Sequence, residues 1–390
     1  MRLLNVIAST NPEHGGVIEW VRQFGTIAVT LGHQVEVASL DDPDAPWVTE
    51  FPLTVHALGH VFRNFYSPKL TPWLIANRHH YDAVLTHGLW RYPSFGTWRA
   101  LRASDTPHFI YTHGMLDPWF KHEYPLKHLG KWLYWPWTDY RALRDATGVI
   151  FTCEQEKLKA RKSFWLYRAR ELVTTIGITA PSGDPESQRR LFHETFPETS
   201  GKHTLLFLGR IHPKKGCDLL IRTFAKAATS AKDLHLVIAG PDNTHWAPTL
   251  KQIANDAHIS DRITWTGMIS DNLKWGAFHA AEAFILPSHQ ENFGIAVVEA
   301  MACGTPVLIS DKVDIFSEIL SDNAGFVSGD TQNETNGLVQ RWLDTPQDIR
   351  DGMGRNALAS FRKRFEVCSA TQGLLDLLQQ EASIGIGKHP

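Results

Sequence analysis

Short apolar runs alternate with longer stretches of helical periodicity along most of the chain. In the first half, a helical period over 17–31 stops at Gly32, and the strand-like runs are 3–8, 34–39, 83–86, 109–112 and 149–152. In the second half, the strand-like runs are 205–208, 234–239, 263–266, 283–286 and 307–309. Because strands that alternate with helices pair in parallel, the pattern predicts α/β structure with two doubly wound sheets.

A break in this pattern separates the two halves. Residues 176–185 contain two glycines and two prolines and show no period, which is typical of the start of an interdomain linker. The chain has 390 residues, which is too long for one ordinary core. We therefore expect a first domain at 1–177 and a second at 178–365. The helical period over 366–381 predicts a final helix, and residues 366–390 are expected to pack back on the first domain.

Composition and charge narrow the classes of function. A hydrophobic content of 43% and a charged content of 21% are typical of a globular protein, and a formal net charge of -2 argues against nucleic-acid binding. The four cysteines are too widely spaced for a zinc or disulfide framework, and reduced thiols in the cytoplasm are the simplest interpretation. The apolar run at the N-terminus is too short for a signal sequence and is interpreted as the first strand. No segment is long and apolar enough to predict a membrane span.

The most informative stretch of the sequence follows the apolar run 283–286. Glu291 lies in the loop after this predicted strand, and Glu299 lies about two turns into a predicted helix that stops at Gly304. In open α/β sheets, ligands bind at the carboxyl ends of the strands, and a helix N-terminus there suits a phosphate. A carboxylate on each side of an anion site can accept hydrogen bonds from sugar hydroxyls. The stretch therefore indicates a nucleotide-sugar site.

Other strand ends of the second half carry further candidate ligands. Arg210 follows one strand, and Lys215 comes shortly after it, so the two side chains can neutralise a diphosphate without a metal. A solvated basic loop explains the motif equally well when it is taken alone, and Lys214 is interpreted as the solvated neighbour. Two glycine turns end the next strands and permit close approach of the backbone to a base or ribose, although ordinary turns are an equal alternative: Gly240-Pro241 and Gly267-Met268-Ile269.

Four loops of the first half also carry polar residues of interest. Glu13-His14-Gly15-Gly16 joins the first strand to the first helix, and it lacks the GxGxxG fingerprint of NAD enzymes. Two Thr-His-Gly triplets place His87 and His113 at carboxyl ends of strands, where a histidine can face a ligand. Asp42-Pro43-Asp44 formally reads Asp-x-Asp, but a solvated loop is the favoured interpretation, and the sequence predicts no metal site.

The segment 119–144 is rich in Trp, Tyr, Lys and Arg, including the run KWLYWPW at 131–137. Such a belt can lie on a membrane surface or hold an amphiphilic acceptor. A helix that buries its aromatic side chains against the first sheet is the favoured interpretation. The basic stretch 157–170 is interpreted as a solvated helix face.

Taken together, these motifs resemble the retaining glycosyltransferases of family 4, which have the GT-B architecture. The resemblance covers nearly the whole chain. It depends on Gly209-Arg210 with Lys215-Gly216, on Gly240-Pro241, and on the Glu-x7-Glu pattern from Glu291 to Glu299. It implies two Rossmann-like doubly wound domains that face each other across a cleft, with the C-terminal helix crossing back to the first domain. The acceptor would bind the first domain and the nucleotide sugar the second.

The resemblance also implies roles for individual residues. Its catalytic set is His113, Arg210, Lys215 and Glu291, with Arg210 and Lys215 on the donor diphosphate and Glu291 at the transferred sugar. Its donor-binding set is Gly16, Gly240, Met268, Ile269, Asn292, Phe293, Gly294, Ile295 and Glu299, the last at the ribose diol. His87 would face the acceptor. The linker departs from the family pattern, because Thr175-Ile176-Gly177 stands where Pro-Asn-Gly is usual and the asparagine contact is lost.

The reaction implied by the resemblance is a metal-independent transfer of a hexose from a nucleotide sugar to an acceptor hydroxyl. UDP-glucose is the first expected donor, ahead of GDP-mannose and UDP-N-acetylglucosamine, and no other cofactor is expected. The implied acceptor is a saccharide or lipid-linked saccharide in cell-surface or exopolysaccharide synthesis. The expected location is the cytoplasm, with peripheral contact at the inner face of the membrane as an alternative. A nucleotide-sugar epimerase and a non-catalytic sugar-binding component stay open as other functions.

Overall fold

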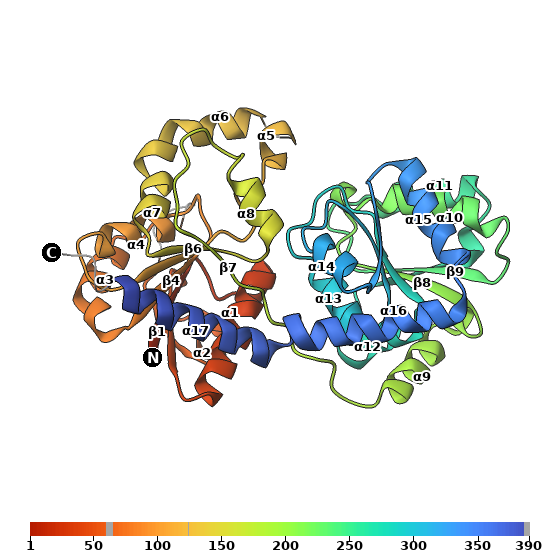
Figure 1. Cartoon of the computed structure of the whole chain (residues 1–390), viewed down its shortest axis with the longest axis horizontal. Helices are drawn as coiled ribbons and strands as arrows, with labels where there is room; N and C mark the ends of the chain where they lie inside the picture. Colours follow the sequence, from red (N-terminus) through yellow and green to blue (C-terminus); the bar gives the residue numbers. More distant parts are fainter. Residues whose placement is uncertain (60–64, 124, 386–390) are drawn as a thin grey trace. The chain divides into compact units, whose positions relative to one another are not determined.

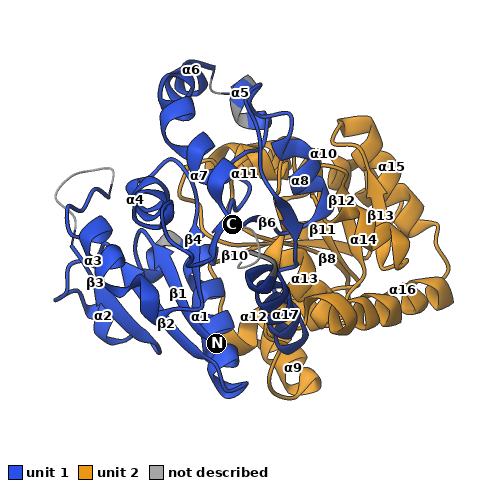
Figure 2. Cartoon of the chain, turned by 60° about the vertical axis from the view of Figure 1, so that its left-hand side comes forward, with its two compact units in different colours: residues 1–177, 367–390 blue, residues 178–366 orange. Residues whose placement is uncertain are grey.

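The computed structural model of the protein describes residues 1–59, 65–123 and 125–385. The chain divides into two compact units, coloured separately in Figure 2. Unit 1 consists of Met1–Gly177 with Val367–Pro390, and unit 2 consists of Ile178–Glu366. Each unit has one parallel sheet with helices packed on it (Figure 1), so the predicted α/β class is confirmed.

Unit 1 contains a seven-stranded parallel sheet in the order β3-β2-β1-β4-β5-β6-β7. Its strands are β1 (Arg2–Ile7), β2 (Gln34–Ser39), β3 (Thr54–Ala57), β4 (Ala83–His87), β5 (His108–Tyr111), β6 (Gly148–Phe151) and β7 (Glu171–Val173). The apolar pattern predicted five of them and missed β3 and β7. These two are short edge strands that are only partly buried, so their sequences lack the continuous apolar run of a central strand.

The predicted final helix is observed as α17 (Val367–Gly385), which belongs to unit 1 and packs against α1 (Gly16–Thr30). The chain leaves unit 1 at Gly177, directly beneath this helix. A Cβ added to Gly177 would lie 2.7 Å from the Cα of Val367, which is closer than real side chains approach. Packing against α17 therefore requires glycine at this position.

Unit 2 contains a six-stranded parallel sheet in the order β10-β9-β8-β11-β12-β13. Its strands are β8 (His203–Leu208), β9 (Leu234–Ala239), β10 (Ile263–Gly267), β11 (Ala283–Leu286), β12 (Val307–Ser310) and β13 (Gly325–Ser328). Five were predicted, and the one missed, β13, is again a short edge strand. Because the strands are parallel, the loops that follow β8, β9, β10 and β11 all lie at the same edge of the sheet.

One helix boundary of unit 2 differs from the prediction. Glu299 lies about one turn into α13 (Ile295–Ala302), not two turns. The helix begins late because Gly294 has a left-handed φ of 76°, and because Glu291 upstream is held in a parallel bridge with Val313. The two carboxylates are therefore joined by an extended loop and one helical turn.

The predicted aromatic belt forms α5 (Trp119–Glu123), α6 (Pro125–Tyr134), a short 3-10 turn (Trp135–Trp137) and most of α7 (Asp139–Asp145). Trp135 is fully buried in the core of unit 1, as the favoured interpretation requires, but Trp137 is exposed. The belt is thus only partly a core element. Among the described residues, none of the helices combines the length and the hydropathy that a membrane span needs.

Candidate active site

The candidate site of unit 2 is built at the carboxyl edge of its sheet. The loop after β8 carries Arg210 and Lys215, and the loop after β11 carries Glu291. The ammonium of Lys215 forms an ion pair with the Glu291 carboxylate, and these side chains are only 17% and 19% exposed. Arg210 is exposed and makes no ion pair with any residue that the structure describes. Two residues more than 70 positions apart in the sequence thus form a partly buried ion pair next to the exposed Arg210.

Backbone contacts hold these two loops together. The hydroxyl of Ser288 donates a hydrogen bond of 2.7 Å to the carbonyl oxygen of Lys214. Gly216 has a φ of 67°, and a Cβ there would lie 2.2 Å from the carbonyl oxygen of Pro287. Since no L side chain fits so close to a backbone atom, the glycine of the Lys-Gly motif is what allows the loop after β8 to reach the loop after β11.

The charge of Lys215 is set by opposing effects. Burial, together with the positive charges of Lys214 and Arg210, lowers the pKa of Lys215 to about 8. The carboxylate of Glu291 acts in the opposite direction, because an adjacent negative charge favours the ammonium form. Lys215 is therefore protonated at neutral pH and ready to bind an anion.

A second ion pair forms the other side of the site. Lys274, on α12 (Asp271–Ala280), donates a hydrogen bond of 2.9 Å to the carboxylate of Glu299 on α13. Burial raises the pKa of Glu299, and Lys274 opposes that shift. The sequence did not point to Lys274, because a single lysine inside a predicted helix gives no signal of its own. Its position on the helix that follows the Met268-Ile269 loop is the feature that could have identified Lys274 as a candidate site residue.

The remaining predicted donor ligands of unit 2 lie at the same sheet edge. Met268 is exposed and Ile269 is half-buried in the loop after β10. Phe293 is buried with its ring edge-on to Phe365, and Ile295 is exposed at the first position of α13. The structure thus places at one edge of the sheet all the residues of unit 2 that the sequence predicted for the catalytic and donor-binding sets: Arg210, Lys215, Gly240, Met268, Ile269, Glu291, Asn292, Phe293, Gly294, Ile295 and Glu299.

The predicted residues of unit 1 form a second cluster. His87 ends β4, and its Nδ1 lies 3.1 Å from Nε2 of His113, while its Nε2 lies 2.9 Å from Oδ1 of Asn5. Because Oδ1 only accepts, Nε2 of His87 carries the proton and its Nδ1 accepts from His113. Burial lowers the pKa of His113 to about 4, and burial together with His113 lowers the pKa of His87, so both rings are neutral at pH 7. Because the neutral ring of His113 carries its proton on Nε2, its Nδ1 can accept a hydrogen bond.

The backbone around His113 is held in place by a carboxylate that the sequence did not single out. Glu156 accepts hydrogen bonds of 2.6 Å from the Thr112 hydroxyl and from the Gly114 amide. These bonds hold His113 at a φ of 49°, which few non-glycine residues adopt.

Gly16 is the remaining predicted residue of unit 1. It is the first residue of α1, and it follows Gly15, whose φ is 92°.

The Asp-x-Asp motif takes no part in either cluster. Asp42 and Asp44 are both exposed, and the carboxylate of Asp42 accepts a hydrogen bond of 3.0 Å from the Asp44 amide. This is a local turn in a solvated loop. Within residues 1–59, 65–123 and 125–385, no group of three or more His, Cys, Asp or Glu side chains is arranged to hold a metal.

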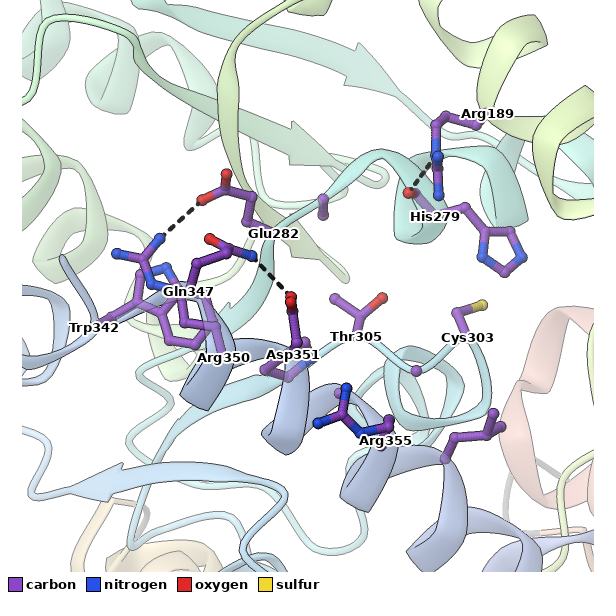
Figure 3. Close-up of a pocket in the computed structure, with 15 residues that line it drawn as sticks. Arg189, His279, Glu282, Cys303, Thr305, Trp342, Gln347, Arg350, Asp351 and Arg355 are labelled. Atoms are coloured by element: carbon purple, nitrogen blue, oxygen red, sulfur yellow. Dashed lines mark hydrogen bonds and ion pairs between the residues drawn. The ribbon is translucent and has the colours of Figure 1, made fainter. Parts of the chain in front are cut away.

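A cavity of about 490 Å³ also lies in unit 2, but at the opposite, amino edge of the sheet (Figure 3). Glu282 and Thr305, which line it, precede β11 and β12. Its charges are mixed, and Arg350 is already paired with Glu282 at 3.2 Å. None of the predicted site residues lines it, so the cavity is not the candidate active site.

Two models of protein families match most of the chain. Residues 188–359 match glycosyl transferases group 1, and residues 15–177 match the glycosyl transferase 4-like domain. Curated relatives include alpha-D-kanosaminyltransferase of Streptomyces kanamyceticus, 24% identical over 63% of each chain. They also include D-inositol 3-phosphate glycosyltransferase of Mycolicibacterium smegmatis, 38% identical over 65% of this chain and 57% of the relative. The chain therefore spans less than two thirds of the length of these relatives.

Solved structures share the fold along the whole chain. Sucrose-phosphate synthase from Thermosynechococcus elongatus superposes with a TM-score of 0.77 and 19% identity, covering 98% of this chain and 100% of that chain. HepE of Anabaena, solved in complex with UDP-glucose, superposes with a TM-score of 0.74 and 18% identity, covering 97% and 100%. Together with the two matched family models, this likeness shows that the chain belongs to the GT-B glycosyltransferases of the GT4 type.

Proposed function

We propose that the protein is a retaining glycosyltransferase that moves a hexose from a nucleotide sugar to an acceptor hydroxyl. The observation that carries the proposal is the pair of ion pairs at the carboxyl edge of the second sheet, Lys215 with Glu291 and Lys274 with Glu299. A diphosphate needs cations, and ribose and hexose hydroxyls need acceptors. Both kinds of group are held there at the N-terminus of α13, which favours an anion.

In the proposed reaction, the bond between the anomeric carbon and the leaving phosphate oxygen breaks while the acceptor oxygen forms a bond to that carbon. The acceptor proton passes to the leaving phosphate. Negative charge grows on the diphosphate, and Lys215 and Arg210 stabilise it. Glu291 hydrogen-bonds hydroxyls of the hexose and orients the sugar, rather than forming a covalent bond to it. A glycosyl adduct isolated on Glu291 would overturn this role.

UDP-glucose is the proposed donor, and a saccharide or lipid-linked saccharide of a cell-surface or exopolysaccharide is the proposed acceptor. The HepE complex with UDP-glucose supports the choice of donor. The relatives act on other acceptors by name, inositol 3-phosphate among them, so the acceptor is the part that varies. His113 and His87 of unit 1 are proposed to face the acceptor side, with Nδ1 of His113 available as an acceptor of hydrogen bonds.

The function is tested by incubating the purified protein with radiolabelled UDP-glucose, with and without a panel of saccharide acceptors. Transfer of label to an acceptor with the anomeric configuration retained, read by NMR, supports the proposal. Conversion of the sugar without any acceptor would instead show an epimerase. Binding of the donor without either reaction, across the panel, would favour a non-catalytic sugar-binding protein. A thermal-shift screen of nucleotide sugars ranks the donors independently, because a ligand of the folded state raises its stability.

The pKa of Lys215 predicts how donor use depends on pH. Only the protonated lysine binds phosphate, and the pKa of Lys215 in the free protein is lowered to about 8. We therefore expect kcat/KM for the donor to be constant below this pH and to fall about tenfold per pH unit above it. In Lys215→Arg the side chain stays protonated, so its profile should be flat over the same range. A wild-type profile that is flat to pH 10 would contradict the role of Lys215.

The role of Glu299 predicts a loss of donor affinity. In Glu299→Ala the ribose loses a charged hydrogen-bond acceptor, so we expect the Kd for UDP, measured by calorimetry, to rise about 10- to 100-fold. Glu282→Ala is the matched control, because Glu282 also pairs with a cation, Arg350, but at the opposite edge of the same sheet. The control should leave the Kd unchanged. Equal affinity in Glu299→Ala and wild type would remove Glu299 from the donor site.

A further inference from the structure

Unit 1 exposes an apolar face on α6 that its own core does not use. Leu126 and Leu133 are 84% and 77% exposed, and Leu129 between them is exposed as well. Their spacing of three and four residues places them on one side of the helix. The other side of α6 faces the core through His128, which is buried. In both Figure 1 and Figure 2, α6 lies at the margin of unit 1, away from its sheet.

Two tryptophans extend this face. Trp137 is exposed one turn after Leu133, and Trp165 is 79% exposed. The ring of Trp165 stacks on that of Trp132 of α6, with their centroids 5.7 Å apart, so the two segments are neighbours. We call these five side chains the leucine-tryptophan face: Leu126, Leu129, Leu133, Trp137 and Trp165. Single exposed apolar residues are ordinary, but five neighbouring ones mark an interaction surface.

Basic side chains border the face. Residues 157–170 contain six lysines and arginines and no aspartate or glutamate, whereas the whole chain has a net charge of -2. Several of the six pair with carboxylates elsewhere in unit 1, but Lys162 and Arg168, on either side of Trp165, are exposed. Arg141 lies over the ring of Trp137, 5.2 Å from its centroid. The surface therefore combines leucines, tryptophans and positive charge.

We propose that the leucine-tryptophan face docks unit 1 on an anionic phospholipid bilayer. Leucines on one side of a helix enter the boundary between head groups and acyl chains, and tryptophans prefer the same depth. Lysines and arginines at the border then meet anionic head groups. A second copy of this chain fits less well, because two basic borders would repel each other. The inference goes beyond the proposed function, since it concerns where the protein works and not what it transfers.

The test measures binding of the 390-residue chain to sedimented phosphatidylcholine vesicles, with and without phosphatidylglycerol, in the absence of substrates. We expect binding to the anionic vesicles that salt weakens. The variant Leu126→Ser/Leu129→Ser/Leu133→Ser should bind at least about tenfold more weakly. Lys162→Glu/Arg168→Glu should also bind more weakly. The matched control replaces exposed apolar residues of unit 2, Leu191→Ser/Leu320→Ser/Ile349→Ser, and should bind like wild type.

Two further measurements distinguish docking from dimerisation. Light scattering reports the oligomeric state, and tryptophan fluorescence reports contact with lipid. Quenching of wild-type fluorescence by brominated lipids, reduced in Trp165→Ala, would support docking without relying on the leucine variant. The proposal is overturned if the wild-type protein does not bind anionic vesicles. It is also overturned if a correctly folded leucine variant binds them as strongly as wild type. So does a wild-type dimer that the leucine variant dissociates, because the face would then join two copies. Since no sugar is present, these outcomes do not depend on glycosyl transfer.

Discussion

Replacing Lys215 with methionine is expected to lower kcat/KM for the nucleotide sugar by about 10³-fold. Methionine keeps the length of the side chain but removes the charge that meets the leaving diphosphate. Removal of one group aimed at the charge that develops in a transition state typically costs 10²- to 10³-fold. The upper end applies here because Lys215 is held at low exposure, where a charge is weakly screened. Steady-state kinetics with varied donor concentration measures the loss.

A structural cost of the same substitution has to be separated from the catalytic one. Lys215→Met leaves the partly buried carboxylate of Glu291 without its partner, which destabilises the loop between β11 and α13. Lys215→Met/Glu291→Gln removes that unpaired charge, so its unfolding midpoint should return toward that of wild type while its activity stays low. Lys214→Met is the matched control for losing a lysine from the same loop, and should cost less than about tenfold.

Two outcomes would contradict this assignment. If Lys215→Met retained wild-type kcat/KM, Lys215 would not contact the diphosphate, and the exposed Arg210 would have to supply its charge alone. If the double variant recovered activity together with stability, the ion pair would serve only to hold the loops. The first outcome concerns chemistry and the second concerns folding, and the comparison of rate with unfolding midpoint distinguishes them.

The order of the helices and strands could be predicted from the sequence because each buried central strand is a continuous apolar run. The runs at 283–286 and 307–309, for example, are continuous and apolar, and they became β11 and β12. The strands missed, β3, β7 and β13, are edge strands with partly exposed residues. Their pairing is decided by the neighbouring strand and not by local hydrophobicity, so the sequence pattern could not reveal them.

The sequence placed the candidate residues at one edge of the sheet but did not reveal their contacts. Motif order placed Lys215 and Glu291 at one sheet edge, because parallel strands end together. It could not pair Lys215 with Glu291, or Glu299 with Lys274, because side-chain geometry depends on loops such as that begun by Gly216. The role of Glu156 could not be predicted for the same reason, since the hydrogen bond that it accepts from Thr112 joins residues 44 positions apart in the sequence.

Replacing Gly240 with alanine is expected to lower the free energy of unfolding of unit 2 by about 3 kcal/mol or more. Gly240 was predicted as a position of close approach to ligand, but its nearest neighbour is the sheet itself. A Cβ would lie 1.9 Å from the carbonyl oxygen of Gly209, and the φ of 134° is one that L side chains rarely adopt. The strands cannot separate easily, because the Gly209 amide donates to Ala239 and the Gly240 amide to Gly267.

The measurement is chemical denaturation followed by circular dichroism, with donor affinity determined on the folded fraction. Gly337→Ala is the matched control, because Gly337 lies in α15 (Gln332–Leu343) with nothing within 4 Å of an added Cβ. Alanine suits a helix better than glycine, so the control should gain about 1 kcal/mol. Since Gly209 precedes Arg210, strain at Gly240 should also displace that cation and weaken UDP binding. If Gly240→Ala kept wild-type stability but lost UDP binding, the glycine would serve the ligand and not the sheet, as the sequence first indicated.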